Sequence, residues 1–133
     1  MDEDKIFALL QAAKETMENA YAPYSHFTVG AALLTEGGEI YTGCNVENAS
    51  FGVSVCAERT AFLKAVSQGN REFFAIAVIS NGTQYTLPCG VCRQTMLEFC
   101  GDDFLIFCAD KDGAYKEYKL KELIPNGFRL NRD

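Results

Sequence analysis

Residues 56–109 read CAERTAFLKAVSQGNREFFAIAVISNGTQYTLPCGVCRQTMLEFCGDDFLIFCA, and this stretch decides the fold. The segment from Cys56 to Val66 has a strongly helical composition, and Gly69 stops the helix. Phe73 to Ile79 is a continuous apolar run of strand length. The first half of the stretch therefore predicts a helix followed by a buried strand.

The second half of the stretch repeats this alternation. Asn81-Gly82 turns the chain, and Pro88 precedes a second helix that we expect from Cys89 to about Phe99. Phe104 to Ala109 has the composition of another buried strand. Each of the two predicted helices thus begins at a cysteine, beyond the end of a strand.

The residues before this stretch predict one helix and one hairpin. Residues 3–20 carry apolar side chains at helical intervals between charged ones, which indicates an amphipathic helix that ends near Tyr21. Residues 27–34 look like a buried strand, and Gly37-Gly38 supplies a tight turn into a second strand over residues 39–44.

The residues after 109 predict a turn at 111–113, a polar edge strand over 115–120 and a short helical turn in the tail. The order of elements is helix, two strands, helix, strand, helix, two strands. Such alternation predicts a three-layer α/β fold, with a mixed central sheet of about five strands and helices on both faces. We expect residues 1–133 to form one domain.

Composition narrows the class of protein. Of the 133 residues, 48% are hydrophobic and 23% charged, as in an ordinary globular domain. The formal net charge is -6 and the basic residues are scattered, so we expect no nucleic-acid polymer as a ligand. The chain opens with acidic residues and has no long apolar run, which predicts a cytoplasmic protein without a membrane span.

The spacing of the cysteines points to a metal. Six cysteines in a short chain could form disulfides, but that requires an oxidising compartment to which nothing directs this chain. Cys56, Cys89 and Cys92 can instead converge, because the last two lie three residues apart on one helical turn. Soft sulfur ligands select zinc, and three protein ligands leave a fourth tetrahedral position open for catalysis.

Two alternatives remain open for the cysteines. A structural zinc site would be closed by a fourth thiolate, which Cys44, Cys100 or Cys108 could supply. Those three lie within or beside apolar stretches, however, where free cysteine usually packs as a small hydrophobe. A closed site also usually pairs two cysteine knuckles, whereas this chain has one knuckle and one separate cysteine, followed two residues later by Glu58.

Charged and polar neighbours extend the candidate site. Arg59 lies on the same helix face as Cys56 and is expected to donate hydrogen bonds to the thiolates, or else to be a solvated surface residue. Glu58 is a candidate general acid and base, although a glutamate in a first helical turn often only complements the helix dipole. Asn45 and Glu47 could bracket sugar hydroxyls or simply form a turn, and His26, the lone histidine, is expected to be structural.

These motifs resemble those of a known family. Cys-Ala-Glu followed by Pro-Cys-Gly-Val-Cys resembles the signature of zinc nucleoside and nucleobase deaminases, in which histidine often takes the place of the first cysteine. The three-cysteine variant looks like the small homo-oligomeric cytidine deaminases. The match extends through residues 24–32, 42–51 and 89–94 and so covers nearly the whole chain.

The resemblance implies an activity and an assembly. It implies hydrolysis of cytidine and deoxycytidine to uridine and deoxyuridine with release of ammonia, as in pyrimidine salvage, by a homotetramer with one zinc ion per subunit. Relatives that act on a nucleoside antibiotic such as blasticidin S, on guanine or on a tRNA adenosine are the closest rivals. A non-enzymatic zinc module is the rival from another class, and it would show a fourth protein ligand.

The resemblance also implies the roles of individual residues. It implies that three cysteines bind zinc and that Glu58 shuttles protons between the activated water and the base. Thr28 and Val91 depart from the proline and alanine that are commoner in the family, which bears on substrate preference and not on the reaction. The implied zinc ligands are Cys56, Cys89 and Cys92, and the implied substrate contacts are Phe27, Asn45, Glu47, Ala57 and, from a neighbouring subunit, Phe128.

Overall fold

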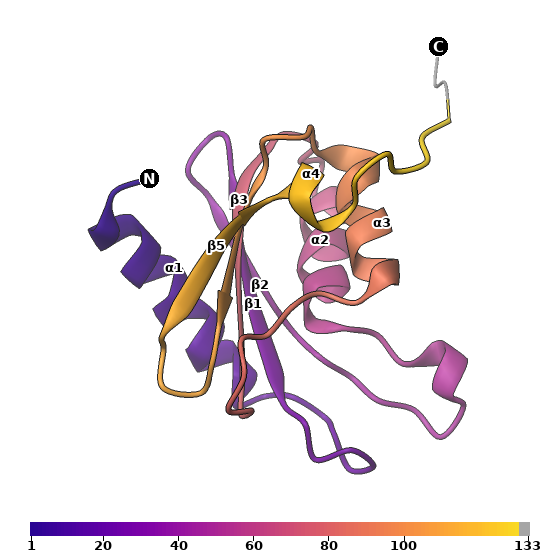
Figure 1. Ribbon diagram of the computed structural model, residues 1–133. Helices are drawn as coiled ribbons and strands as arrows, with labels where there is room; N and C mark the ends of the chain where they lie inside the picture. Colours follow the sequence, from indigo (N-terminus) through magenta and orange to yellow (C-terminus); the bar gives the residue numbers. More distant parts are fainter. Residues whose placement is uncertain (131–133) are drawn as a thin grey trace.

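A five-stranded mixed sheet forms the centre of the molecule (Figure 1). The computed structural model describes residues 1–130. The strands, in chain order, are β1 (Val29–Thr35), β2 (Ile40–Cys44), β3 (Phe73–Ser80), β4 (Leu105–Ala109) and β5 (Tyr115–Lys119), and their order in the sheet is β2-β1-β3-β4-β5.

Helices cover both faces of this sheet. One face packs against α1 (Glu3–Met17), and the other packs against α2 (Ala57–Ser67) and α3 (Gly90–Phe99), as Figure 1 shows. A short helix, α4 (Leu120–Leu123), follows β5, and a 3-10 turn spans Phe51–Val53. The predicted three-layer α/β fold, with a mixed sheet of about five strands and helices on both faces, is confirmed.

The strand directions decide where the helices begin. β1 pairs antiparallel with β2 and with β3, whereas β3 and β4 run parallel and are joined by a crossover that contains α3. Because α2 precedes β3 and α3 precedes β4, the two helices begin at the same end of the sheet. The two cysteines at these helix starts are thereby brought to one place.

Two apolar clusters hold the layers together. On the α2 and α3 side, Phe62 is fully buried and its ring lies 5.0 Å from that of Phe73 and 6.1 Å from that of Phe104, measured between centroids. On the α1 side, a Cβ on Gly30 would lie 2.0 Å from the carbonyl oxygen of Ala13. Only glycine lets α1 approach β1 this closely.

Two element boundaries differ from those expected. The first helix ends at Met17, not near Tyr21, because residues 18–20 make tighter bonds to carbonyls three residues earlier. The first strand begins at Val29, not at Phe27, because the polar groups of the backbone around Phe27 bond mainly to side chains. The other elements begin and end within two residues of their predicted bounds.

Within residues 1–130, none of the helices combines the length and the apolar character that crossing a membrane requires. The single domain expected over residues 1–133 stays a prediction, and its last three residues lie outside the described part of the chain.

Candidate metal centre and active site

Three cysteine sulfurs meet at the N-termini of α2 and α3. Cys56 and Cys89 are the N-cap residues of these helices, and Cys92 lies in the first turn of α3. The Sγ atom of Cys89 is 3.6 Å from that of Cys56 and 3.5 Å from that of Cys92, and all three atoms lie within 4.8 Å of one another. Sulfurs around a tetrahedral zinc ion are roughly 3.8 Å apart, so the cluster fits this ion.

The electrostatics of this cluster favour thiolates. A helix N-terminus carries partial positive charge, which stabilises a thiolate at the N-cap. The pKa of Cys56 is lowered to about 5, first by the hydrogen bond that it shares with Cys92 and then by Arg59. The interaction with Cys56 raises the pKa of Cys92, whose side chain is buried. The three sulfurs are close enough together to hold a cation between them.

Glu58 lies beside the sulfur cluster in the first turn of α2. Its side chain is only 5% exposed, although it carries an ionisable carboxyl group. Burial raises the pKa of Glu58 to about 7, and the neighbouring Cys56 thiolate acts in the same direction. A carboxyl group with this pKa can both accept and donate a proton near neutral pH.

A small cavity opens onto these groups. It has a volume of about 170 Å³ and is lined by two of the three cysteines, by Glu58 and by several predicted substrate contacts. Ligand pockets usually measure about 300–1,000 Å³, so this cavity is smaller than a typical ligand pocket. Its lining residues are Phe27, Val29, Asn45, Cys56, Ala57, Glu58, Thr86, Leu87 and Cys89.

The structure places Asn45 in the wall of this cavity and Glu47 outside it. The side chain of Asn45 is buried, accepts from the amide of Val29 at 2.9 Å and donates to the carbonyl of Phe27 at 2.7 Å. Glu47 does not line the cavity, but lies in the adjoining groove, where Ser25 donates to its carboxylate. This side-chain hydrogen bond is the main cause of the lowered pKa of Glu47.

Arg59 lies against the sulfur cluster, on the same face of α2 as Cys56. Its Nη2 atom donates to the carbonyl of Ser54 at 3.0 Å and lies 3.9 Å from the Sγ atom of Cys56. Its Nε atom is buried without a hydrogen-bond partner in the described part of the chain. The guanidinium group is thus placed to offset the negative charge of the thiolates.

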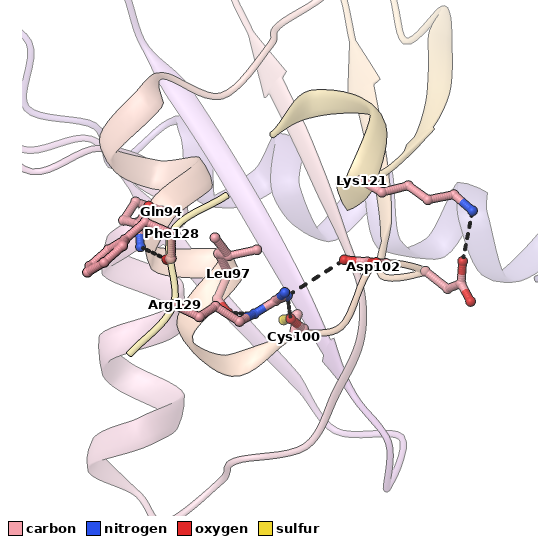
Figure 2. A network of polar contacts seen from close by, with 8 residues as sticks. Gln94, Leu97, Cys100, Asp102, Lys121, Phe128 and Arg129 are labelled. Carbon is pink, nitrogen blue, oxygen red and sulfur yellow. Dashed lines mark hydrogen bonds and ion pairs between the residues drawn. The ribbon is translucent and has the colours of Figure 1, made fainter. Parts of the chain in front are cut away.

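Phe128 lies on a tail that is fixed along α3 (Figure 2). Gln94 donates to the carbonyl of Phe128 at 2.9 Å, and Arg129 donates to the carbonyls of Leu97 at 3.2 Å and Cys100 at 3.0 Å. The Phe128 side chain is 67% exposed and does not line the cavity of its own chain. The tail therefore leaves the Phe128 ring exposed on the surface of the chain.

Three residues of the cavity wall were not predicted from the sequence: Val29, Thr86 and Leu87. Thr86 and Leu87 line the cavity, and the buried Thr86 hydroxyl is fixed by the carbonyl of Ala109 at 2.6 Å and by Ser80 at 2.7 Å. Their position directly before Pro88 and Cys89 was the available signal, because a wall next to a metal ligand must also face the site.

The remaining cysteines do not join the cluster. Among residues 1–130, Cys56, Cys89 and Cys92 form the only group of three or more histidine, cysteine, aspartate or glutamate side chains that could hold a metal ion. Cys44, Cys100 and Cys108 therefore do not supply a fourth protein ligand. Burial raises the pKa of Cys100 and of Cys108 to about 12, as expected for core thiols. Cys44 was also expected in the core, but it is only half-buried, because it ends the edge strand β2.

Three converging cysteine sulfurs next to a buried carboxyl group are the arrangement expected of a zinc-dependent hydrolase, in which the protein supplies three ligands and water takes the fourth position. Residues 3–108 match the model of the cytidine and deoxycytidylate deaminase zinc-binding region, and the chain belongs to this family, whose cofactor is zinc. The family inferred from the sequence motifs is therefore confirmed.

Individual relatives agree with this membership. A cytidine deaminase of Sporosarcina psychrophila is 45% identical over 128 residues, which cover 96% of this chain and 92% of the relative. The crystal structure of a cytidine deaminase from Burkholderia pseudomallei has a TM-score of 0.90 and 44% identity, and covers 96% of this chain and 100% of its own. A blasticidin-S deaminase of Bacillus cereus is 30% identical over 131 residues, covering 92% of this chain and 91% of the relative.

Proposed function

We propose that this chain is a cytidine deaminase, which hydrolyses the exocyclic amino group of cytidine to give uridine and ammonia. The observation that carries the proposal is the buried Glu58 carboxyl group, which lines the same cavity as Cys56 and Cys89. Membership of the deaminase family and the 45% identity to a cytidine deaminase support the same reaction.

Cys56, Cys89 and Cys92 hold one zinc ion per chain in this proposal. The distances between their sulfurs fit a tetrahedral ion, and no fourth cysteine of the described residues is near enough to close the site. Zinc bound there supplies a Lewis acid that makes water a nucleophile near neutral pH. Arg59 offsets the net negative charge of three thiolates around a divalent ion.

Glu58 moves the protons of the reaction. It takes a proton from the attacking water and delivers it to N3 of the cytosine ring, so that C4 becomes electrophilic. It then passes the second proton of that water to the departing amino group, and the bond between C4 and N4 breaks to release ammonia. A pKa of about 7 suits a group that must accept and donate in one cycle.

Residues around the cavity bind the nucleoside. Phe27 packs against the base, and the amide of Ala57, at the first position of α2, donates to the pyrimidine carbonyl. Asn45 and Glu47 hold the ribose hydroxyls, which favours a nucleoside over a free base. Deoxycytidine fits the same contacts, because its 3'-hydroxyl is still present.

A neighbouring subunit completes the site. The cavity of one chain is about 170 Å³, while the exposed Phe128 ring is held outward on α3. A homotetramer in which Phe128 covers a substrate of the adjoining subunit accounts for both observations. We place this enzyme in the cytoplasm, in pyrimidine salvage.

Blasticidin S is the alternative substrate, because a blasticidin-S deaminase is also a relative, although a more distant one at 30% identity. The test measures ammonia and the deaminated product of each substrate from cytidine, deoxycytidine, cytosine and blasticidin S, with zinc-loaded and chelator-treated protein. Zinc-dependent turnover of cytidine supports the proposal. Turnover of blasticidin S alone by protein with one zinc per chain would replace cytidine as the substrate.

A further inference from the structure

The loop that carries Phe27 contains an unfavourable backbone conformation. His26 has a φ of 58°, in the left-handed region that side chains other than glycine rarely adopt. Such a conformation persists only where surrounding contacts determine it. The next residue, Phe27, lines the cavity beside the metal cluster. The contacts that hold His26 therefore also fix the position of the Phe27 ring.

Asn81, at the end of the neighbouring strand β3, supplies three hydrogen bonds to residues 26–28. It follows the last residue of β3, and its amide donates to the carbonyl of Thr28 at 3.1 Å. Its Oδ1 atom accepts from the amide of Thr28 at 3.2 Å, and its Nδ2 atom donates to the carbonyl of His26 at 2.9 Å. One carboxamide thus bonds to the peptide groups on both sides of Phe27.

Other side chains satisfy the remaining polar groups of these two peptides. The amide of Phe27 donates to Ser25 Oγ at 3.0 Å, and its carbonyl accepts from Asn45 Nδ2 at 2.7 Å. The ring itself is backed by Gly82, where a Cβ would lie 3.2 Å from the Cε1 atom of Phe27. Three side chains therefore bond to the peptide groups on either side of Phe27, and Gly82 packs against its ring.

We infer that Asn81 is a positioning residue, which sets the Phe27 ring against the base of the bound nucleoside. The inference rests on the proposed function, because it takes Phe27 to contact the substrate. Asn81 does not line the cavity, so its effect on binding passes through Phe27. The carboxamide of Asn81 accepts from Thr28 and donates to His26 at once, whereas an ionised aspartate lacks the donor and alanine lacks both groups.

The test compares Asn81→Ala and Asn81→Asp with the control Asn70→Ala. The Asn70 side chain also makes one long-range hydrogen bond, to the Tyr41 hydroxyl at 2.7 Å, but it does not line the cavity. Both Asn81 variants should raise KM for cytidine about tenfold and change kcat less than about threefold, whereas the control should leave both constants unchanged. Zinc content should stay at one per chain.

A double-mutant cycle with Phe27→Ala separates this inference from the proposed function. If Phe27→Ala raises KM and Asn81→Ala adds nothing in that background, the positioning role is supported. If Phe27→Ala raises KM while Asn81→Ala alone has no effect, or if the two effects add fully, the positioning role is overturned. An unchanged KM in Phe27→Ala overturns the proposed base contact instead.

Gly82→Ala provides a second variant that keeps every hydrogen bond of Asn81. Its added Cβ would press on the Phe27 ring and should also raise KM with kcat nearly unchanged. If Asn81→Ala does not fold, an unchanged KM in Gly82→Ala overturns the inference.

Discussion

Gly43 of β2 lies directly against Ala57, the first residue of α2. A Cβ on Gly43 would stand 2.5 Å from the carbonyl oxygen of Ala57, a separation at which the backbone would have to move. Because Cys56 and Glu58 flank Ala57, this contact between strand and helix positions the proposed metal ligand and the proposed proton carrier relative to the sheet.

Gly43→Ala should therefore damage the metal site as well as the fold. The added Cβ would also lie 2.5 Å from the amide nitrogen of Ala61, so α2 must shift. We expect a loss of about 2–3 kcal/mol in the free energy of unfolding, together with weaker zinc retention. Denaturant unfolding and zinc analysis check this against Gly101→Ala, whose Cβ would meet nothing within 4 Å. Equal stability and equal zinc retention in the two variants would show that the close contact between Gly43 and α2 does not matter for the metal site.

Glu58→Gln should keep the zinc ion and lose turnover. Glutamine has nearly the same shape but cannot carry a proton, so kcat should fall by about three orders of magnitude while KM changes little. Steady-state kinetics and metal content measure both effects, and Glu72→Gln, at an exposed position, serves as the control. Substantial turnover in Glu58→Gln would rule out this residue as the proton carrier.

Cys92→Ala should release the metal, whereas Cys100→Ala should not. Both cysteines are buried along α3 or at its end, but only Cys92 belongs to the sulfur cluster. Loss of one of three ligands should abolish turnover and lower Tm by several degrees, because bound metal stabilises only the folded chain. Zinc analysis and thermal melts test this, and a zinc-loaded, active Cys92→Ala variant would contradict the ligand set.

Cys100 and Cys108 should resist alkylation in the folded protein. Burial raises the pKa of each thiol to about 12, so the reactive thiolate stays scarce up to strongly alkaline pH. In the unfolded chain these thiols ionise near pH 9, so their ionisation favours unfolding between about pH 9 and pH 12 and stability should fall across that window. Mass-spectrometric labelling and melts against pH measure the two effects, and fast labelling of either thiol at pH 8 would disagree with burial.

Arg129→Ala should weaken substrate binding by freeing the tail that carries Phe128. Arg129 bonds to two carbonyls at the end of α3, and Asp102 lies 3.8 Å from its guanidinium group (Figure 2). KM should rise about tenfold, as in Phe128→Ala. Arg71→Ala is the matched control, because Arg71 bonds to the carbonyls of Val66 and Asn70 at the end of α2. An equal rise in KM in Arg71→Ala would show that the contacts between Arg129 and α3 are not the cause of the weaker substrate binding.

Most of the fold and the metal cluster could be predicted because their signals are local. Cys56 and Cys89 were placed correctly at helix starts, since composition and the preceding turns mark those starts within a few residues. The role of Asn81 could not be seen in this way, because its partners lie 53 and 55 residues earlier in the chain. The Asn81-Gly82 pair was correctly read as a turn, but a turn signal does not reveal a distant partner.

The division of the sulfur ligands between two crossover connections has a consequence for biosynthesis. Cys56 leaves the ribosome well before Cys89 and Cys92, and β4, which completes the parallel pair with β3, follows only at Leu105–Ala109. No fragment that stops before this strand contains both the ligands and the sheet that brings them together. A nascent chain can therefore assemble the proposed metal site only after β4, which ends at Ala109 of 133 residues, has been made, and a product truncated before β4 should lack a complete site.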